Sequence, residues 1–419
     1  MQLTAFTGPY TVGDNIGGIG LRFWELACAL AEAGIDVHLV CPPGSDTTWS
    51  SDRVRVTVFD EDTWRTVVET SDAVMTGAEA DTRVILHAHT TGRLLIAETG
   101  VPVEQLDYDR LRNAPDPADA YQEVMDQYLL QVVTADHLLA RSDVERAGLY
   151  ATLAALGRLT PAEHTRSRTL DHLVSLLPIG FGARADAVLA TTPITAQPVE
   201  FCWSGGIWDF YDTEAVCAAT ALLRDEGMSV RTRFLYAPPP DQEILEAARL
   251  HRAIEEYGLQ DLVLLHPGPL RHSERDSLML ATRALVCLAR PGVENELCHR
   301  LRLRDALLYR TPVVVDSHGA SGDWMRRLGI GLAVDTHDVR QVADAMAALT
   351  RDDHQLTACL HAIERERPLH RIEANTGPLL RALTDGRPAT WADRRWRDEV
   401  VAQILARRPA LAHSPLQLV

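Results

Sequence analysis

The stretch LTAFTGPYTVGDNIGGIGLRFWELACALAEAGIDVHLVCPPG, residues 3–44, decides the fold class. It begins with a short apolar run, Leu3–Thr7, which is followed by a loop rich in glycine. Apolar residues then recur at helical spacing until Gly34, and a second apolar run, Val37–Cys41, ends at two prolines. A strand, a helix and a strand in this order form one βαβ unit, which predicts a parallel sheet covered by helices.

The same alternation continues along the chain and predicts two sheets. Further strands are expected at residues 54–59, 73–76 and 84–88, and a second alternating series starts at Val199. Residues 183–198 are rich in Ala, Thr and Pro and show little helical periodicity, so we expect a linker there. The fold class is therefore α/β, with two Rossmann-like, doubly wound parallel-sheet domains facing a cleft. The expected domains are residues 1–190 and 198–390, followed by a C-terminal helix in residues 391–419 that packs back toward the first domain.

The composition excludes several classes of function. The chain has 419 residues and a formal charge of −17, which argues against nucleic acid as a partner. It contains no lysine, which excludes Schiff-base chemistry on a lysine and nucleotide hydrolysis of the P-loop type. All 41 basic residues are arginine, a usage typical of a GC-rich genome such as that of an actinobacterium.

Other patterns bear on location and cofactors. No run reaches the roughly 18 apolar residues of a membrane span, so stable membrane insertion is not expected. The N-terminal segment lacks the basic and apolar regions of a signal peptide, which favours the cytoplasm. The seven cysteines are scattered and form no C-x-x-C, so neither zinc nor a disulfide framework is expected. We expect no cofactor.

The glycine loop Gly17–Gly20 stands directly before the first predicted helix. Glycine lets a ligand approach the backbone N–H groups at the positive end of a helix. The spacing is not G-x-G-x-x-G, which disfavours a dinucleotide site. A ligand cradle and a plain tight turn are equally compatible with this loop when it is taken alone.

Four segments, in the same order along the chain, resemble glycosyltransferase family 4, and three of them resemble one bacterial branch of it. The glycine loop with its helix, GGIGLRFWELACALAEAG, is similar to the start of these enzymes. The segment LGRLTP followed by LVSLLPIGF is similar to the end of their first domain, and WSGGIWDFYDTEAV to the opening of their second. The segment ENELCHRLRLRDALLYRTPVVV resembles their donor site.

The resemblance implies a retaining enzyme of the GT-B fold. A nucleoside-diphosphate sugar donor would bind the second domain and an acceptor the first. We expect a soluble small-molecule acceptor, as in bacterial specialised metabolism, because residues 390–408 mix both charge signs and do not form a basic amphipathic helix. The nucleotide base, the sugar, the attacking atom and the oligomeric state stay open. The alternatives are a sugar-nucleotide epimerase of the same fold and a non-catalytic sugar-nucleotide-binding partner.

The donor segment assigns carboxylates by resemblance. Asp305 occupies the place of the family's second glutamate, which accepts hydrogen bonds from the ribose hydroxyls. The first glutamate would fall on Leu297, so that match fails. Glu294 fits the bacterial branch better than Glu296 and is the candidate for donor binding, but which carboxylate touches the sugar stays open. The same acids could instead pair with Arg300 or Arg302.

The leaving diphosphate needs donors and a cation. Most family members carry basic residues after the first strand of the second domain, but WSGGIWDFYD has none. We therefore expect the N–H groups of Gly205 and Gly206 to bind the diphosphate together with Arg300 or Arg302, since a guanidinium binds phosphate bidentately. The two arginines lie two positions apart, so on one helix they cannot face the same way. One should bind phosphate, and the other should pair with Glu294 or Glu296.

The first domain offers weaker candidates. Gly18 and Gly20 are expected near the donor, and Arg22 near the acceptor or the phosphate. His89, in VILHAHTTG after a predicted strand, is the candidate for the family's histidine near the donor sugar, whereas His87 is read as a core histidine.

Tryptophans and acidic pairs complete the candidates. Trp203 and Trp208 could line the ligand site, although a tryptophan is more often part of the core. The Asp-x-Asp pattern of metal-dependent glycosyltransferases occurs at residues 60–62 and 107–109, in each case as expected for a solvated acidic turn. We therefore expect no catalytic metal.

Overall fold

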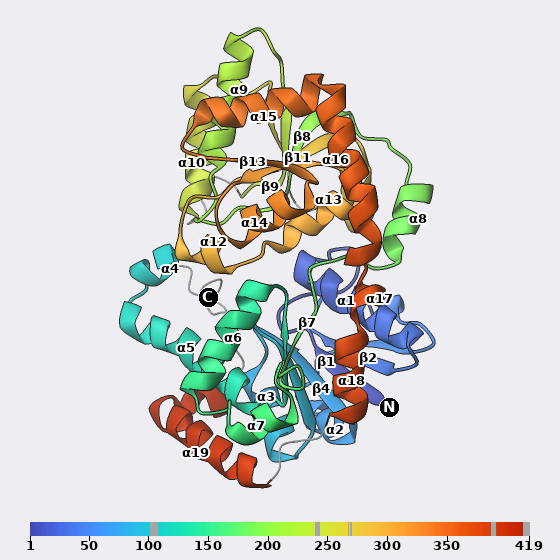
Figure 1. Ribbon diagram of the computed structural model, residues 1–419, viewed down its shortest axis with the longest axis vertical. Helices are drawn as coiled ribbons and strands as arrows, with labels where there is room; N and C mark the ends of the chain where they lie inside the picture. Colours follow the sequence, from blue (N-terminus) through green and yellow to red (C-terminus); the bar gives the residue numbers. More distant parts are fainter. Residues whose placement is uncertain (101–107, 239–243, 267, 269, 387–390, 414–419) are drawn as a thin grey trace. The chain divides into compact units, whose positions relative to one another are not determined.

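The computed structural model describes residues 1–419 except 101–107, 239–243, 267, 269, 387–390 and 414–419. Its contacts divide the chain into two compact units (Figure 1). Unit 1 comprises residues 1–178 and 372–419, and unit 2 comprises residues 179–371. Asp107, in the second acidic pattern above, lies outside the described residues.

Unit 1 contains a parallel sheet with the strand order β3-β2-β1-β4-β5-β6-β7. Its strands are β1 (Gln2–Phe6), β2 (Asp36–Cys41), β3 (Val54–Val58), β4 (Ala73–Gly77), β5 (Leu94–Glu98), β6 (His137–Ala140) and β7 (Val174–Leu176). Its helices are α1 (Gly18–Glu32), α2 (Trp64–Thr70), α3 (Thr82–Thr90), α4 (Tyr108–Asn113), α5 (Pro117–Thr134), α6 (Asp143–Ala155), α7 (Pro161–Arg166), α17 (Ile372–Asn375), α18 (Gly377–Asp385) and α19 (Trp391–Arg407).

Each face of this sheet has its own apolar core. Successive side chains of a strand point to opposite faces, so Leu3 and Ala5 belong to one core and Phe6 to the other. Helix α1 and residues of α17 and α18 cover the first face, and residues of α3, α5 and α6 cover the second. Helix α19 contacts α5. The later part of the chain thus completes the helical cover of a sheet that the earlier part builds.

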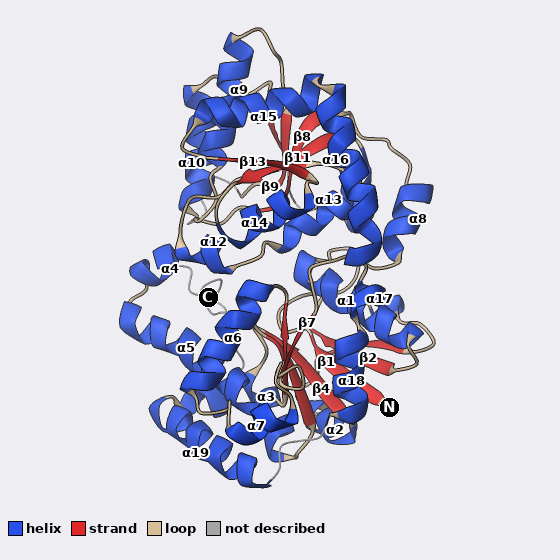
Figure 2. Cartoon of the chain, in the orientation of Figure 1, coloured by secondary structure: helices blue, strands red, loops and turns tan. Residues whose placement is uncertain are grey.

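Unit 2 contains a second parallel sheet, with the order β10-β9-β8-β11-β12-β13, and helices on both faces (Figure 2). Its strands are β8 (Val199–Gly206), β9 (Thr232–Tyr236), β10 (Val263–Leu265), β11 (Thr282–Cys287), β12 (Val313–Asp316) and β13 (Gly331–Val334). Its helices are α8 (Arg184–Thr191), α9 (Thr213–Asp225), α10 (Leu245–Glu256), α11 (His272–Leu280), α12 (Val293–Leu297), α13 (Arg304–Leu308), α14 (Gly319–Leu328), α15 (Val339–Arg351) and α16 (Asp353–Glu366).

The two doubly wound parallel sheets confirm the predicted fold class. Two local predictions were wrong. Residues 84–88 belong to helix α3, because Val84, Ile85 and Ala88 are buried at helical spacing and the Asp81 side chain caps the first turn. The expected linker, residues 183–198, contains helix α8, whose Ala185 and Val188 are buried against unit 2.

Parallel strands bring their carboxyl ends to one edge of the sheet. In unit 2, β8 ends at Gly206, β11 at Cys287 and β12 at Asp316. Ligands of open α/β sheets bind at this edge, beside the strands where the chain order reverses. Strands β8 and β11 are such neighbours in this sheet, and most of the donor candidates follow one or the other.

Candidate functional site

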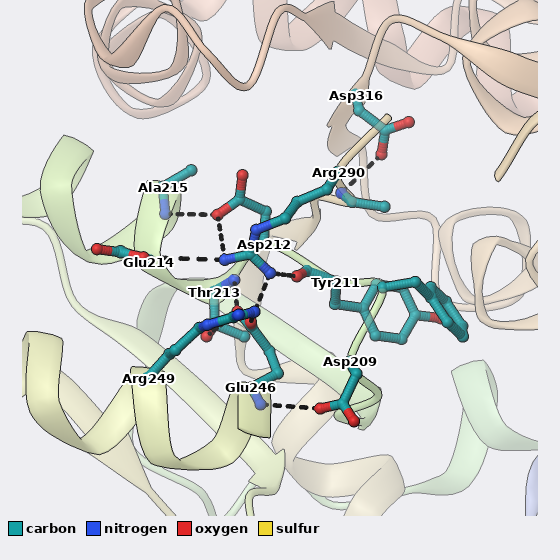
Figure 3. Close-up of polar contacts among 12 residues, drawn as sticks. Asp209, Tyr211, Asp212, Thr213, Glu214, Ala215, Glu246, Arg249, Arg290 and Asp316 are labelled. Carbon is teal, nitrogen blue, oxygen red and sulfur yellow. Dashed lines mark hydrogen bonds and ion pairs between the residues drawn. The ribbon is translucent and has the colours of Figure 1, made fainter. Parts of the chain in front are cut away.

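The loop between β8 and α9, residues 207–212, is held by a polar network that we call the loop clamp (Figure 3). Its members are Asp209, Tyr211, Asp212, Thr213, Glu246 and Arg290. The centre is Glu246, which is fully buried at the start of α10. One of its carboxylate oxygens accepts hydrogen bonds of 2.7 Å from both the N–H and the hydroxyl of Thr213. The other oxygen accepts from Arg290.

Arg290 ties this loop to the loop that follows β11. Its guanidinium donates to the carbonyl of Tyr211 and contacts the carboxylate of Asp212, as Figure 3 shows. The distance to Asp212 is 3.4 Å. Burial opposes its charge, but the hydrogen bond that Arg290 donates to Glu246, together with the nearby acids, raises the pKa of Arg290 above its usual value. A permanently charged arginine held by buried carboxylates leaves the 207–212 loop little freedom.

The clamp also occupies the N-terminus of α9. The Asp212 side chain accepts from the N–H of Ala215, and Glu246 takes the N–H of Thr213. Helix N-termini commonly bind phosphate through such N–H groups. Here the carboxylates of Asp212 and Glu246 already accept hydrogen bonds from these N–H groups. A diphosphate at this edge of the sheet therefore depends on other donors.

Arg302 lies directly on the glycine pair of β8. Its guanidinium carbon is 2.7 Å from the position that a Cβ on Gly205 would take, so any side chain at 205 would displace it. Its Nη2 donates to the carbonyl of Gly206 at 2.6 Å. Its Nη1 is buried without a hydrogen-bond partner among the described residues.

Two aromatic rings, those of Tyr211 and Trp203, also contact the guanidinium of Arg302. The guanidinium carbon lies 4.3 Å from the ring centre of Tyr211 and 5.5 Å from that of Trp203. Cation–π contacts of this kind fix a guanidinium plane without using its N–H groups. The structure therefore brings Arg302, Gly205 and Gly206 together, and their binding of a diphosphate stays a prediction.

Arg300 points into the interior instead. Its Nη2 lies 2.6 Å from the carboxylate of Asp316, and both side chains are almost fully buried. Its Nη1 donates to the carbonyl of Cys287 at 3.0 Å, and its Nε to Ser321 at 3.2 Å. Burial opposes the charge, and Asp316 raises the pKa of Arg300 above its usual value. The partner is Asp316, at the end of β12, and not Glu294 or Glu296 as predicted.

Asp305 lies beside the glycine pair of β8. Its Oδ2 accepts from the hydroxyl of Ser204 at 2.7 Å and from Nη2 of Arg275 at 2.7 Å. The side chain is only 6% exposed. The structure thus brings Asp305 to the end of β8, where donor binding is expected, but it also engages one of its oxygens in a buried ion pair.

The ion pair continues into a buried chain of polar groups. Nη1 of Arg275 donates to the hydroxyl of Tyr309, which donates to Asp276, and Asp276 pairs with Arg184 of α8. Burial raises the pKa of Tyr309 well above its usual value, so the phenol stays protonated and donates. Arg275 is therefore held in place by Tyr309 while it pairs with Asp305.

The two glutamates lie on the short helix α12. Glu294 is half-buried and its carboxylate folds back over Gly292, whereas Glu296 is exposed. Neither was found paired with Arg300, whose carboxylate partner is Asp316. The assignment of Glu294 to donor binding stays a prediction.

Three candidates of unit 1 lie on helix α1: Gly18, Gly20 and Arg22. Gly18 begins α1 and is exposed, and no side chain caps this helix. Gly20 allows a close approach, because a Cβ there would stand 2.3 Å from the carbonyl oxygen of Thr11. Arg22 is buried, with Nε 2.6 Å from Glu98 and its Nη groups on the carbonyls of Leu177 and Pro178. Arg22 therefore joins α1, β5 and the end of β7, which is a structural role.

The two histidines lie on helix α3 and not after a strand. Nε2 of His89 is 2.8 Å from Asp398 of α19, and the ring is buried. His87 bonds to Glu69 and contacts the ring of Trp64 edge-on. The His89 contact joins α3 to α19, so one of its two ring nitrogens is already engaged by a carboxylate, and its role near the donor sugar stays a prediction.

Among the members of this site that sequence reasoning missed are Ser204, Glu246, Arg275 and Arg290. Arg290 follows β11 at its carboxyl end, and that position alone could have marked it. Glu246 and Arg275 lie in ordinary amphipathic helices, and no local pattern separates them from surface charges.

No group of three or more His, Cys, Asp or Glu side chains among the described residues is arranged to hold a metal ion. None of the helices described is both long and apolar enough to cross a membrane.

No model of a known protein family matches the sequence, and no curated protein matches it significantly. Solved structures match over nearly the whole chain. Sucrose-phosphate synthase from Thermosynechococcus elongatus is 17% identical, with a TM-score of 0.58, over 92% of this chain and 99% of that one.

Two further structures show the same likeness. An α,α-trehalose-phosphate synthase (UDP-forming) from Burkholderia vietnamiensis is 11% identical, with a TM-score of 0.61, over 94% of this chain and 99% of the other. Anabaena HepE in complex with UDP and glucose is 14% identical, with a TM-score of 0.59, over 92% and 99%. At these identities the likeness shows the fold, which is the two-domain α/β fold of GT-B glycosyltransferases.

Proposed function

We propose that the protein is a retaining glycosyltransferase of family 4 that transfers a sugar from a nucleoside-diphosphate sugar to a small-molecule acceptor. The observation that carries the proposal is Arg302, which lies on Gly205 and Gly206 at the carboxyl end of β8 with its Nη1 lacking a partner among the described residues. Three of the solved structures of similar fold hold UDP, UDP-glucose or UDP with glucose. We place the protein in the cytoplasm and its acceptor in specialised metabolism.

The proposed transfer depends on stabilising the negative charge of the leaving diphosphate. As the sugar leaves, negative charge develops on the diphosphate, and donors aimed at that charge lower the barrier. Arg302 and the N–H groups of Gly205 and Gly206 are the donors of unit 2 that we assign to it. The acceptor's proton would pass to a leaving phosphate oxygen, so no protein base is required. Unit 1 would bind the acceptor.

The test starts with donor binding. The protein is titrated by calorimetry with UDP, GDP, ADP and dTDP and with UDP-glucose, GDP-mannose, ADP-glucose and dTDP-glucose. Each donor that binds is then incubated with a panel of small acceptors, and the anomeric configuration of the product is read by NMR. Transfer with retention supports the proposal. A new sugar nucleotide formed without acceptor would identify an epimerase, and binding without turnover would identify a non-catalytic partner.

Activity should not depend on a divalent metal. Arginine and backbone N–H groups supply the positive charge for the leaving diphosphate in this proposal, so an ion is not needed for that purpose. Protein treated with EDTA and then desalted should keep most of its transfer rate. A complete loss that manganese or magnesium restores would contradict this part of the proposal.

Asp305→Ala should weaken nucleoside-diphosphate binding by about tenfold, because charge-assisted hydrogen bonds to ribose contribute on the order of 1.5–3 kcal/mol. Since Asp305 also pairs with the buried Arg275, the variant should lose stability as well. Asp276→Asn is the matched control: it disturbs the same buried chain at Tyr309 and Arg184. A folded Asp305 variant with unchanged affinity, or an equal loss in both variants, would reject the ribose role.

A further inference from the structure

Trp208 is exposed at the tip of a loop that cannot easily move. Half of its surface is open to solvent, whereas Trp203, five residues earlier in the same segment, is fully buried. On one side, Asp209 accepts from the N–H of Glu246 at 2.9 Å. On the other, Arg290 donates to the carbonyl of Tyr211, and the N–H of Tyr211 bonds to the carbonyl of Trp208 itself at 2.9 Å.

The loop clamp thus fixes the backbone on both sides of this ring. Single exposed apolar side chains are common on protein surfaces, so exposure alone decides nothing. An indole on a pliable loop would turn inward and bury its area. Here the clamp depends on Glu246, a fully buried carboxylate, and releasing it would leave that charge without its partners. The loop therefore presents a large, rigid, amphipathic ring to solvent.

The position of the ring relates it to the donor site. Three of its atoms lie 3.8 Å from the point where a Cβ on Gly206 would stand. Gly206 is the residue whose carbonyl accepts from Arg302. The indole and the guanidinium therefore meet the same glycine, one at its α-carbon and the other at its carbonyl.

The groups follow one another along the end of β8 and the loop after it in the order of a nucleotide sugar. Asp305, assigned to the ribose, bonds to Ser204. Arg302, assigned to the diphosphate, lies on Gly205 and Gly206. Trp208 comes next along the chain, where the part of the donor beyond the diphosphate is the sugar. The C–H groups on one face of a pyranose ring suit the electron-rich face of an indole.

We propose that Trp208 is the platform on which the transferred sugar ring of the donor rests. The proposal rests on the proposed function, because it assumes that Arg302 binds a nucleoside diphosphate. It adds a specificity-determining residue to that site: a sugar with a flat C–H face would be favoured over one whose face carries axial hydroxyl groups.

The test compares each nucleotide with its own sugar conjugate. Calorimetry measures UDP against UDP-glucose, GDP against GDP-mannose, ADP against ADP-glucose and dTDP against dTDP-glucose, in the wild type and in Trp208→Ala. For the pair that the wild type binds, the variant should weaken the conjugate by about tenfold, which equals about 1.4 kcal/mol, and the free diphosphate by less than about twofold. Trp208→Phe keeps a ring and should restore most of the affinity for the conjugate.

Tyr257→Ala removes another exposed aromatic side chain of unit 2, at the end of α10, and should change neither affinity. An equal loss for diphosphate and conjugate, or no loss for either, would overturn the platform while leaving the proposed function standing. If the wild type binds none of the pairs, the proposed function fails and the platform fails with it.

Discussion

Arg302→Ala should lower the turnover of sugar transfer by about 10²-fold or more, because removing one donor aimed at developing charge in a transition state has that order of effect. The guanidinium is fixed by Tyr211 and Trp203 and lies on the glycine pair of β8, so no reorganisation is needed when the diphosphate leaves. Donor binding in the ground state should weaken less than turnover does. Stopped initial-rate assays with saturating donor, together with calorimetry, separate the two effects.

Two variants make this measurement specific. Arg302→Lys keeps the charge but loses the planar fork, so it should recover only part of the turnover. Arg340→Ala removes a half-exposed arginine of α15 and should leave the rate unchanged. If Arg302→Ala turned over normally, the cation for the leaving group would have to come from elsewhere in the chain.

Arg300→Ala should destabilise the protein by about 3–5 kcal/mol, because it leaves the buried carboxylate of Asp316 without its partner. The lost contacts include Cys287 and Ser321, so β11, β12 and the start of α14 all lose a shared anchor. Urea unfolding followed by circular dichroism measures the change. The turnover of the folded fraction should stay close to that of the wild type.

A double-mutant cycle shows whether the pair is the cause. Arg300→Ala with Asp316→Ala should cost clearly less than the sum of the two single variants, because neither charge is then left alone. Asp316 also accepts from the N–H of Ala289, so the double variant should not return to wild-type stability. A stable Arg300→Ala variant with a lost rate would mean that the two arginines have exchanged roles.

The sequence predicted the fold where the apolar pattern was long and punctuated. Residues 3–44 form β1, α1 and β2 as expected, because glycines and prolines mark their ends. The run Val84–Ala88 was misread because five apolar and polar residues fit either a strand or one helical turn. The following strand, β5, then went unrecognised as a separate element.

The candidate site was predicted in part. The spacing of Arg300 and Arg302 showed that they must face different ways, but their partners lie far along the chain: Asp316 for one and Gly206 for the other. Glu246 and Arg290 are 44 residues apart and meet only because α10 and the end of β11 reach the same edge of the sheet. Contacts of this kind depend on the packed sheet, and no local pattern carries them.

The return of the chain to unit 1 has a consequence for its synthesis. Residues 179–371 are contiguous, so unit 2 has its whole sequence as soon as they emerge from the ribosome. Unit 1 has all its strands early, yet Ile372, Leu379 and Leu383 of its core arrive last. During most of translation, one face of the first sheet therefore lacks part of its cover. The nascent chain should bind chaperones through that face until the ribosome has passed α18, and a slow codon placed before residue 372 should prolong the binding.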